Sequence, residues 1–314
     1  MSQLDTATIP SALYTEITAC RVCRSPNLTT VLNLGEPCIS DFVLPGEQGH
    51  RAPLEVVCCT NCGLTQLSHT VDRDLLYRDR YWYQSGTNES MVAALRDVAL
   101  TPGRHGVDPQ PGDRVLDIGA NDGTLLRQYP DGLWKAACEP ALQFHAGLLA
   151  DDVDLTPTFW PDGAWSLPIF KVITSIACFY DAEDPVAYAQ AIADHLEPGG
   201  IWIVQLQDAV SILEQNAFDY WCHEHLCLYD LSTFAAVVNQ VGLTVRAVER
   251  VPVNGGSVRY IVSQGAPKLN KWDRDPASLW HRFDATVYRL RNKALYQLTW
   301  LRGEGKLLLG VAAS

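Results

Sequence analysis

Apolar positions between residues 111 and 265 follow two different periods. Short apolar runs bounded by Gly, Pro or acidic residues predict buried strands, and apolar positions three or four residues apart predict helices. The predicted strands span 115–118, 134–139, 169–178, 200–206, 243–251 and 258–263; predicted helices begin near 123 and span 185–196 and 231–241. Strands that alternate with helices and end in a strand pair predict an α/β, doubly wound, mostly parallel sheet with helices on both faces.

The C-terminal part of the chain has a helical period only. Apolar residues recur there at steps of four and three after Pro276, which predicts one long amphipathic helix. These residues are Leu279, Phe283, Val287, Leu290, Ala294, Leu298 and Leu301. Residues 306–314 then begin the pattern of a buried strand.

The N-terminal part carries two Cys-x-x-Cys pairs, Cys20 with Cys23 and Cys59 with Cys62. A tight turn at each pair directs two thiolates to one point, and four thiolates are a tetrahedral ligand set that Zn²⁺ prefers. The residues between the pairs are rich in Leu, Val, Gly and Pro, which is typical of short strands and turns. We therefore expect a structural zinc ion, since four protein ligands leave no open position for water. Disulfides or free thiols are the alternative.

Composition and charge exclude several classes of protein. The 314 residues are 47% hydrophobic and 19% charged, with 9 Trp, 12 Tyr and 8 Phe, which is typical of a folded globular chain. Asp and Glu outnumber Lys and Arg by 36 to 24, and the net charge of -12 disfavours binding to nucleic acid. No apolar run reaches the roughly 18 residues of a membrane span, and no signal-peptide pattern opens the chain. We therefore expect a cytoplasmic protein that does not contact a membrane.

A turn with glycine and acidic residues follows the first predicted strand of the sheet. It contains Asp117, Gly119, Asn121 and Asp122; Gly119 allows a ligand to approach the backbone, and the helix that follows offers free N–H groups. Asn121 stands where a dinucleotide-binding fingerprint has its middle glycine. This difference argues against the binding of a dinucleotide pyrophosphate at the turn. Glu139 ends the second strand, where a carboxylate accepts the two hydroxyls of a ribose. The turn therefore predicts a site for S-adenosylmethionine (SAM); a Rossmann-like unit without a nucleotide is the alternative.

A polar cluster, Cys222-His-Glu-His225, follows the fifth predicted strand, at the rim where ligands bind in this architecture. It places two imidazoles, a carboxylate and a thiol within four residues. Such groups suit the removal of a proton beside a ketone by a base with a pKa near neutral. We expect His223 to be structural. A packed polar loop or an adventitious metal site is the alternative for the whole cluster.

Five motifs together are similar to those of a known enzyme family. They are the paired Cys-x-x-Cys motifs, Tyr-Trp-Tyr-Gln-Ser-Gly at 81–86, Asp-Ile-Gly-Ala-Asn-Asp-Gly at 117–123, Cys-His-Glu-His at 222–225 and Asn-Gly-Gly-Ser at 254–257. On these motifs the chain resembles the sugar C-methyltransferases that methylate carbon 3 of nucleotide-linked 4-keto-deoxyhexoses. The resemblance implies a class I methyltransferase (Rossmann-like) fold, SAM as methyl donor, a small-molecule substrate such as a nucleotide sugar, and a role in deoxysugar and antibiotic biosynthesis.

The resemblance also implies roles for individual residues. His225 would be the base, and we expect the carboxylate of Glu224 to raise the pKa of His225. Glu224 itself would orient groups or bind the sugar. Cys222 stands where the family typically has a tyrosine, whose phenol could stabilise an enolate. Tyr81 and Tyr83 would close over the substrate or the methyl group, with packing at a domain interface as the alternative.

The motifs divide the chain into four predicted parts. These are a zinc-binding domain (1–75), a helical linker and substrate-site segment (76–110), a SAM-binding domain (111–265), and a long helix with the start of a C-terminal lobe (266–314). Relatives continue beyond this point, so we expect the chain to lack most of the lobe that helps to hold the nucleotide sugar. The leading function is SAM-dependent C-methylation through an enolate. O- or N-methylation of another small molecule, or a non-catalytic SAM- and zinc-binding accessory protein, are the alternatives.

Overall fold

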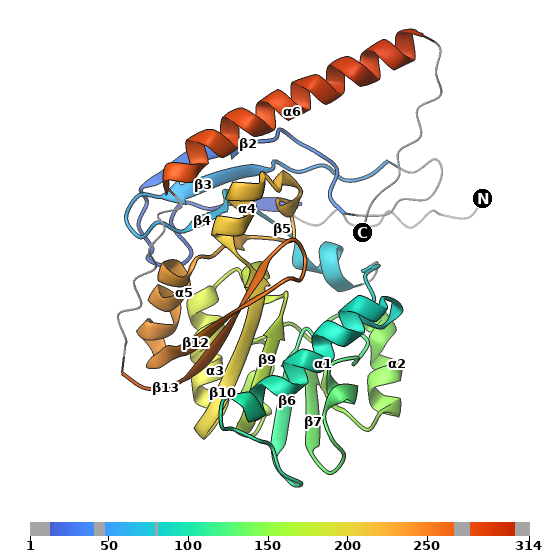
Figure 1. Ribbon diagram of the computed structural model, residues 1–314, viewed down its shortest axis with the longest axis vertical. Helices are drawn as coiled ribbons and strands as arrows, with labels where there is room; N and C mark the ends of the chain where they lie inside the picture. Colours follow the sequence, from blue (N-terminus) through green and yellow to red (C-terminus); the bar gives the residue numbers. More distant parts are fainter. Residues whose placement is uncertain (1–12, 41–47, 79–80, 267–276, 305–314) are drawn as a thin grey trace, which may run out of the picture.

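A seven-stranded sheet lies at the centre of the chain (Figure 1). The computed structural model describes residues 13–40, 48–78, 81–266 and 277–304, and the strand order is β12-β13-β10-β9-β6-β7-β8. The strands are β6 (Arg114–Ile118), β7 (Trp134–Cys138), β8 (Asp154–Thr156), β9 (Phe170–Ile176), β10 (Leu196–Gln207), β12 (Leu243–Val251) and β13 (Ser257–Gln264). All neighbours pair in parallel except β13, which is antiparallel to both β12 and β10. This order confirms the predicted class I methyltransferase fold.

Alternate residues of the central strands belong to two separate hydrophobic cores. Val172 and Ile203 share one core with residues of α1 and α2, whereas Ile173 and Val204 share the other with residues of α3 and α5. The helices are α1 (Glu89–Arg104), α2 (Leu142–Ala150), α3 (Pro185–His195), α4 (Ala209–Gln215) and α5 (Leu231–Val238). Side chains of successive strand residues point to opposite faces, so a strand covered on both sides must be apolar throughout. The near-continuous apolar runs of the sequence reflect this burial.

Two helices, α3 and α5, begin at N-capping residues that can be recognised in the sequence. Asp184 accepts a hydrogen bond from the N–H of Ala187, and Pro185 occupies the first turn of α3. Asp230 and Thr233 form a reciprocal capping box at the start of α5. The predictions of a helix over 185–196 and of one over 231–241 are therefore confirmed to within a few residues. The helices α2 and α4 were not predicted.

The helix predicted near Gly123 is absent from this part of the described chain. A turn occupies the position, followed by the 3-10 helix η3 (Leu126–Gln128). Gly123 has a φ of +78°, outside the right-handed helical region, and Asp122 accepts from both the N–H and the hydroxyl of Thr124. The prediction was wrong because these local side-chain bonds compete with a helical start.

A smaller sheet carries the paired cysteines at one end of the molecule. Its order is β11-β4-β3-β2, and the strands are β2 (Leu28–Asn33), β3 (Glu55–Cys59), β4 (Thr65–Leu67) and β11 (Cys227–Leu228). A separate antiparallel pair joins β1 (Tyr14–Glu16) to β5 (His69–Val71). The strand β11 comes from the chain segment between β10 and α5, so the small sheet includes residues from far along the sequence. The predicted division of the chain into four parts stays a prediction.

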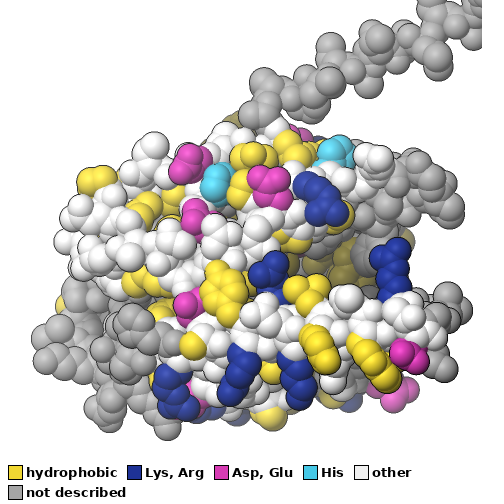
Figure 2. Space-filling model, turned by 90° about the horizontal axis from the view of Figure 1, so that it is seen from above, with side chains coloured by type: hydrophobic (Ala, Val, Ile, Leu, Met, Phe, Trp, Pro, Cys, Tyr) yellow, Lys and Arg dark blue, Asp and Glu magenta, His cyan; other side chains and the backbone are white. Residues whose placement is uncertain are grey.

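The predicted long helix is present as α6 (Ala277–Gly303), which lies along β2 at the top of Figure 1. Trp280, Phe283 and Val287 are buried, and the Tyr288 hydroxyl donates to the carbonyl oxygen of Asn33 at 2.9 Å. In the second half of α6 the hydrophobic side chains are exposed, and Figure 2 shows hydrophobic side chains among Lys and Arg on this upper face of the molecule. They are Leu290, Leu295, Tyr296, Leu298 and Trp300.

Among the helices of the described ranges, none is both long and apolar enough to cross a membrane. The strand pattern predicted for residues 306–314 lies outside the described residues.

Candidate active site

A cavity of about 820 Å³ opens at the carboxyl ends of β6, β7 and β9. Residues from the segment after β5, from the main sheet and from the Cys222–His225 segment line it together. Nine of the ten residues predicted for catalysis or cofactor binding are among its lining residues. They are Tyr81, Tyr83, Asp117, Gly119, Asn121, Glu139, Cys222, Glu224 and His225.

Two buried carboxyl groups lie at the floor of this cavity, on neighbouring strands. Asp117 is in β6, where its Oδ1 accepts a hydrogen bond of 2.6 Å from the hydroxyl of Thr174. Glu139 follows β7, and its two oxygens accept the backbone N–H groups of Asn121 and Ala141 at 2.6 and 2.8 Å. Burial raises the pKa of each carboxyl group to about 7. A cationic ligand would favour the charged form of both groups.

Gly119 brings the backbone close to the cavity. Its φ of +71° lies in the left-handed region, which side chains with a Cβ rarely adopt. A Cβ at this position would also lie 3.1 Å from the Cβ of Cys178. Both conditions require glycine at position 119; the approach of a ligand to the backbone at this turn stays a prediction.

Asn121 and Asp122 are placed to hold the segment 81–86 against the turn. The side chain of Asn121 donates to the carbonyl oxygen of Tyr83 at 3.0 Å and accepts from the N–H of Ser85 at 2.9 Å. Asp122 accepts from the N–H of Gly86 at 2.9 Å and is not among the residues that line the cavity. The structure therefore assigns Asp122 a contact with the protein, where the sequence predicted contact with a cofactor.

His225 is held from two sides in the loop before β11. Its Nδ1 donates a hydrogen bond of 2.6 Å to the carbonyl oxygen of Tyr220, and the centre of the Tyr180 ring lies 4.5 Å from that of the imidazole. Because Nδ1 carries the hydrogen, Nε2 of the neutral ring keeps its lone pair. Burial lowers the pKa of His225, and this effect outweighs the raising contributions of the Tyr220 carbonyl and of Glu224. The expected rise in the pKa of His225 is therefore wrong.

Two carboxyl groups and a thiol lie beside His225. Glu224 Oε2 and Asp181 Oδ1 are enclosed by protein atoms, and neither has a hydrogen-bond partner within the described part of the chain. Burial, followed by the charge of Glu224, raises the pKa of Asp181 well above its usual value. Burial raises the pKa of the Cys222 thiol in the same way, with Glu224 contributing. The surrounding protein residues therefore leave both oxygens without the hydrogen bond that a buried polar atom usually has.

Three tyrosines enclose the same region. Tyr77 lies in η1 (Asp74–Arg78) and donates from its hydroxyl to the carbonyl oxygen of Glu224 at 3.2 Å. The ring centres of Tyr77 and Tyr81 lie 5.6 Å apart, and burial raises the pKa of both phenols, so both remain hydrogen-bond donors. Tyr83 is half-buried and also lines the cavity.

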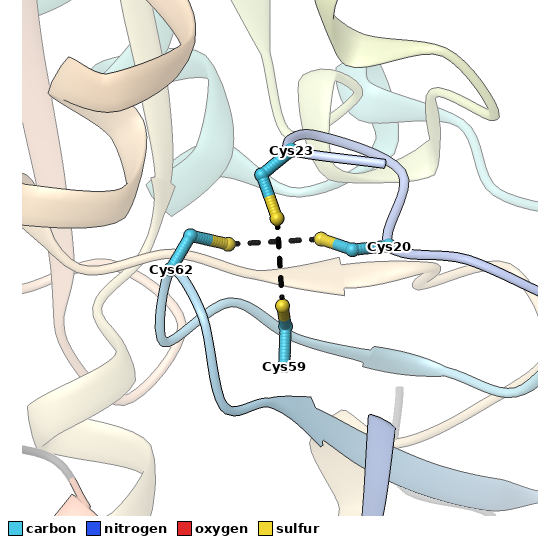
Figure 3. Close-up of side chains that lie close together, drawn as sticks. All are labelled: Cys20, Cys23, Cys59 and Cys62. Carbon is cyan, nitrogen blue, oxygen red and sulfur yellow. Dashed lines mark hydrogen bonds between the residues drawn. The ribbon is translucent and has the colours of Figure 1, made fainter. Parts of the chain in front are cut away.

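The four cysteines of the paired motifs converge on one point from two turns (Figure 3). All four sulfur atoms lie within 4.8 Å of one another, with 3.6 Å between Cys20 and Cys62 and 3.5 Å between Cys23 and Cys59. These separations exceed the ~2.05 Å of a disulfide bond. They are close to the roughly 3.8 Å between ligands of a tetrahedral zinc site with Zn–S bonds of ~2.3 Å. The donor set and its geometry therefore fit zinc.

The cysteine-bearing sheet also holds the loop of His225 in place. Cys227 pairs with Gln66 between β11 and β4, and the N–H of Leu67 donates to the carbonyl oxygen of Leu226 at 2.9 Å. His223 points away from the cavity and donates from Nε2 to the carbonyl oxygen of Ala52 at 3.1 Å. The structural role expected for His223 agrees with this contact.

Sequence reasoning missed several polar residues of the cavity, among them Tyr77, Asp181 and Gln207. Asp181 follows β9 and Gln207 ends β10, so both lie at the carboxyl ends of parallel strands, where ligands bind in open α/β sheets. This rule, applied to every predicted strand, could have identified them. No such signal marks Tyr77 in the sequence, because the position of Tyr77 depends on how the small sheet docks against the main sheet. The hairpin predicted at 254–257 joins β12 to β13, and its Asn254 also lines the cavity.

Comparisons with known proteins match the two parts of the chain separately. Residues 20–77 match a family model described as a zinc binding domain, and residues 88–248, just over half of the chain, match one described as a methyltransferase domain. The chain is 26% identical over 262 residues to the C-methyltransferase NovU of Streptomyces niveus. That match covers 80% of this chain and 61% of the relative, so the chain spans about three fifths of the relative's length.

Solved structures resemble slightly more than half of the chain. An S-adenosylmethionine-dependent methyltransferase of Clostridium acetobutylicum is 13% identical with a TM-score of 0.43, over 55% of this chain and 92% of its own. Magnesium protoporphyrin IX methyltransferase (ChlM) of Synechocystis is 10% identical with a TM-score of 0.44, over 57% of this chain and 88% of its own.

Proposed function

The chain belongs to the family of SAM-dependent methyltransferases, and we propose that it methylates a carbon atom beside a ketone. The observation that carries this proposal is the placement of His225. Its Nδ1 is fixed on the Tyr220 carbonyl, so a ring with a free Nε2 lone pair lines the same cavity as Glu139. Transfer to oxygen or nitrogen can proceed by proximity alone, whereas carbon must first lose a proton to a base.

The floor of the cavity fits SAM. When bound, SAM supplies an electrophilic methyl group on a positively charged sulfur. Each oxygen of Glu139 uses one lone pair on a backbone N–H and keeps another for a ribose hydroxyl. Buried Asp117 and Glu139 have no paired cation in the described structure, and a cationic ligand offsets the cost of ionising them. Gly119 allows that ligand to lie against the backbone.

The other lining residues act on the substrate. His225 takes the proton from the carbon beside the ketone, and its lowered pKa keeps the ring neutral and ready to accept at pH 7. Glu224 Oε2, which is enclosed and unpaired, accepts a hydrogen bond from a substrate hydroxyl or amine. Tyr81 and Tyr83 cover the cavity and exclude water, which strengthens these interactions.

A nucleotide-linked ketosugar is the substrate class that we propose. The relative named C-methyltransferase supports transfer to carbon. The motifs by which the chain resembles sugar C-methyltransferases support a ketosugar. A cavity of about 820 Å³ lies within the range of small-molecule sites. A place in deoxysugar biosynthesis follows from this substrate class.

Cys20, Cys23, Cys59 and Cys62 are proposed to hold one structural zinc ion. With four thiolates bound, the ion has no open position for a substrate, so its contribution is to the fold. Asn61 donates from Nδ2 to the Cys23 sulfur at 3.4 Å, a contact that suits a thiolate ligand.

Solvent exchange tests the proposed reaction. In D₂O without SAM, the protein should catalyse deuterium uptake at the carbon beside the ketone of a candidate ketosugar, and His225→Ala should not. With labelled SAM, mass and position of the added methyl group identify the atom. Methylation of an oxygen or nitrogen without deuterium uptake would contradict the proposal, and SAM binding without turnover would indicate an accessory protein.

A further inference from the structure

We propose that Asp181 is a further catalytic residue, a neutral carboxylic acid that donates a hydrogen bond to the ketone oxygen as the enolate forms. The inference rests on the proposed C-methylation.

The position of Asp181 links it to the base. It ends the short helix η5 (Phe179–Asp181) that follows β9, and it lines the cavity together with His225. The preceding residue, Tyr180, is the one whose ring contacts the imidazole, with 4.5 Å between ring centres. A substrate that offers a carbon to His225 therefore has its carbonyl group within the same enclosed region.

One oxygen of Asp181 is left without a partner by the protein. Oδ1 has no hydrogen-bond partner among the described residues, and Asp181 is one of the residues that line the cavity. An unpaired polar atom in an enclosed site is costly, and a bound ligand removes that cost.

The groups around Asp181 favour its neutral form. Glu224 faces it with like charge, and the imidazole of His225 is neutral because burial lowers its pKa. The remaining titratable neighbours are phenols and thiols that are neutral at pH 7. Those neighbours are Tyr77, Tyr81, Tyr180, Tyr220, Cys178, Cys222 and Cys227. Arg73 is the one guanidinium among the described lining residues, and it is paired with Asp162 at 2.5 Å. Burial, followed by the charge of Glu224, raises the pKa of Asp181 well above its usual value.

The chemistry needs such a donor. When His225 Nε2 takes the proton, the electrons of the C–H bond form the carbon–carbon double bond of the enolate, and the carbonyl π electrons move to oxygen. A donor aimed at that oxygen stabilises the developing charge in a site without water. The Cys222 thiol is a weak donor, and the Tyr77 hydroxyl is already used on the Glu224 carbonyl. After methyl transfer the ketone re-forms, and Asp181 still holds its proton.

Three variants separate this role from a structural one. Deuterium uptake by the wild type should rise with pH as His225 loses its proton and fall again as Asp181 loses its own. Asp181→Ala should lower the uptake rate by about 10²–10³-fold with SAM affinity unchanged, the range seen when one oxyanion donor is removed. Asp181→Asn keeps an N–H donor, so it should lose only about tenfold and should lack the alkaline fall. Asp219→Asn changes an exposed carboxylate that does not line the cavity, so it serves as the matched control and should behave as wild type.

A measurement without substrate completes the test. The infrared difference spectrum between wild type and Asp181→Asn at pH 7 should contain the C=O stretch of a protonated carboxyl group. A carboxylate band in its place, or an Asp181→Asn profile that keeps the alkaline fall, would overturn the inference. If Asp181→Ala fails to bind SAM, its loss of uptake does not report on catalysis. The pH profile of the isosteric Asp181→Asn variant then decides whether Asp181 is the donor. Wild type that takes up no deuterium contradicts the proposed function, whereas wild-type uptake that neither Asp181 variant changes contradicts only the role of Asp181.

Discussion

The backbone N–H of Asn121 donates a hydrogen bond of 2.6 Å to Oε2 of Glu139, which joins the turn after β6 to the end of β7. The N–H of Ala141 binds the other oxygen at 2.8 Å, so the carboxylate is oriented before a ligand arrives. The proposed ribose acceptor is thus fixed by backbone groups, and its remaining freedom is its state of protonation.

SAM affinity should therefore depend on pH near neutrality. The pKa of Glu139 is about 7, so its carboxyl group is mostly protonated at pH 6 and mostly ionised at pH 8. Cationic SAM binds the ionised form, so affinity should fall by about tenfold from pH 8 to pH 6, and by more if Asp117 titrates with it. Calorimetry at three pH values measures this, and Glu139→Gln should flatten the dependence. Affinity that rises as the pH falls would contradict the assignment.

Loss of the ribose acceptor should weaken SAM binding. Glu139→Ala removes a charge-assisted hydrogen bond in a partly dry cleft and should cost about 1.5–3 kcal/mol of binding free energy. Asp131→Ala, an exposed acidic residue in the loop before β7, is a charge-matched control and should change nothing. Equal affinities for wild type and Glu139→Ala in calorimetry would place the ribose elsewhere.

His225→Ala should abolish methyl transfer while SAM affinity stays at the wild-type value, because the base acts on the substrate. The pKa of His225 is lowered by burial, so the neutral form is present down to below its ordinary value of about 6.5. The acid limb of the rate profile should accordingly lie below pH 6.5. In the control His223→Gln, an amide replaces the donor to the Ala52 carbonyl, and kcat should fall at most about threefold. An acid limb above 6.5 would show that another group is the base.

Gly119→Ala should destabilise the fold and impair SAM binding together. The change combines a left-handed φ with a Cβ only 3.1 Å from that of Cys178, and we expect a loss of about 2–3 kcal/mol in the free energy of unfolding. Gly106→Ala is matched in φ, at +76°, but has no atom within 4 Å of the added carbon. It should lose only about 1 kcal/mol. Equal losses in chemical denaturation would show that contact with Cys178 is unimportant.

Elemental analysis should find one zinc ion per chain. Cys20→Ser should lower zinc content and weaken the fold of residues 13–78, because binding free energy at such a site is folding free energy. Cys38→Ser removes an exposed thiol outside the cluster and should leave zinc content unchanged. Zinc-free protein with all four thiols open to titration in the native state would contradict the site.

The sequence predicted the parts of the site that depend on local pattern. Asp117, Glu139 and His225 could be predicted for the site because each ends a strand or stands in a short polar motif, and all three line the cavity. The position of Tyr77 depends on how two sheets dock, and the pairing of β11 with β4 involves a strand of two residues, too short for any periodicity. The pKa of His225 was misjudged because the sequence shows the neighbouring carboxylate and not the burial that outweighs it.

The pairing of Cys227 with Gln66 has a consequence for how the protein reaches its native state. The edge strand β11, which fixes the loop of His225, emerges from the ribosome long after its partner β4. The main-sheet strands β6 to β10 are synthesised between the two. Contacts between such distant residues form slowly, because closing a long chain segment costs entropy. The N-terminal sheet must therefore persist with one side unpaired during synthesis, and a tightly bound metal ion would keep it ordered through that interval. The proposed active site would then be among the last parts of the molecule to assemble.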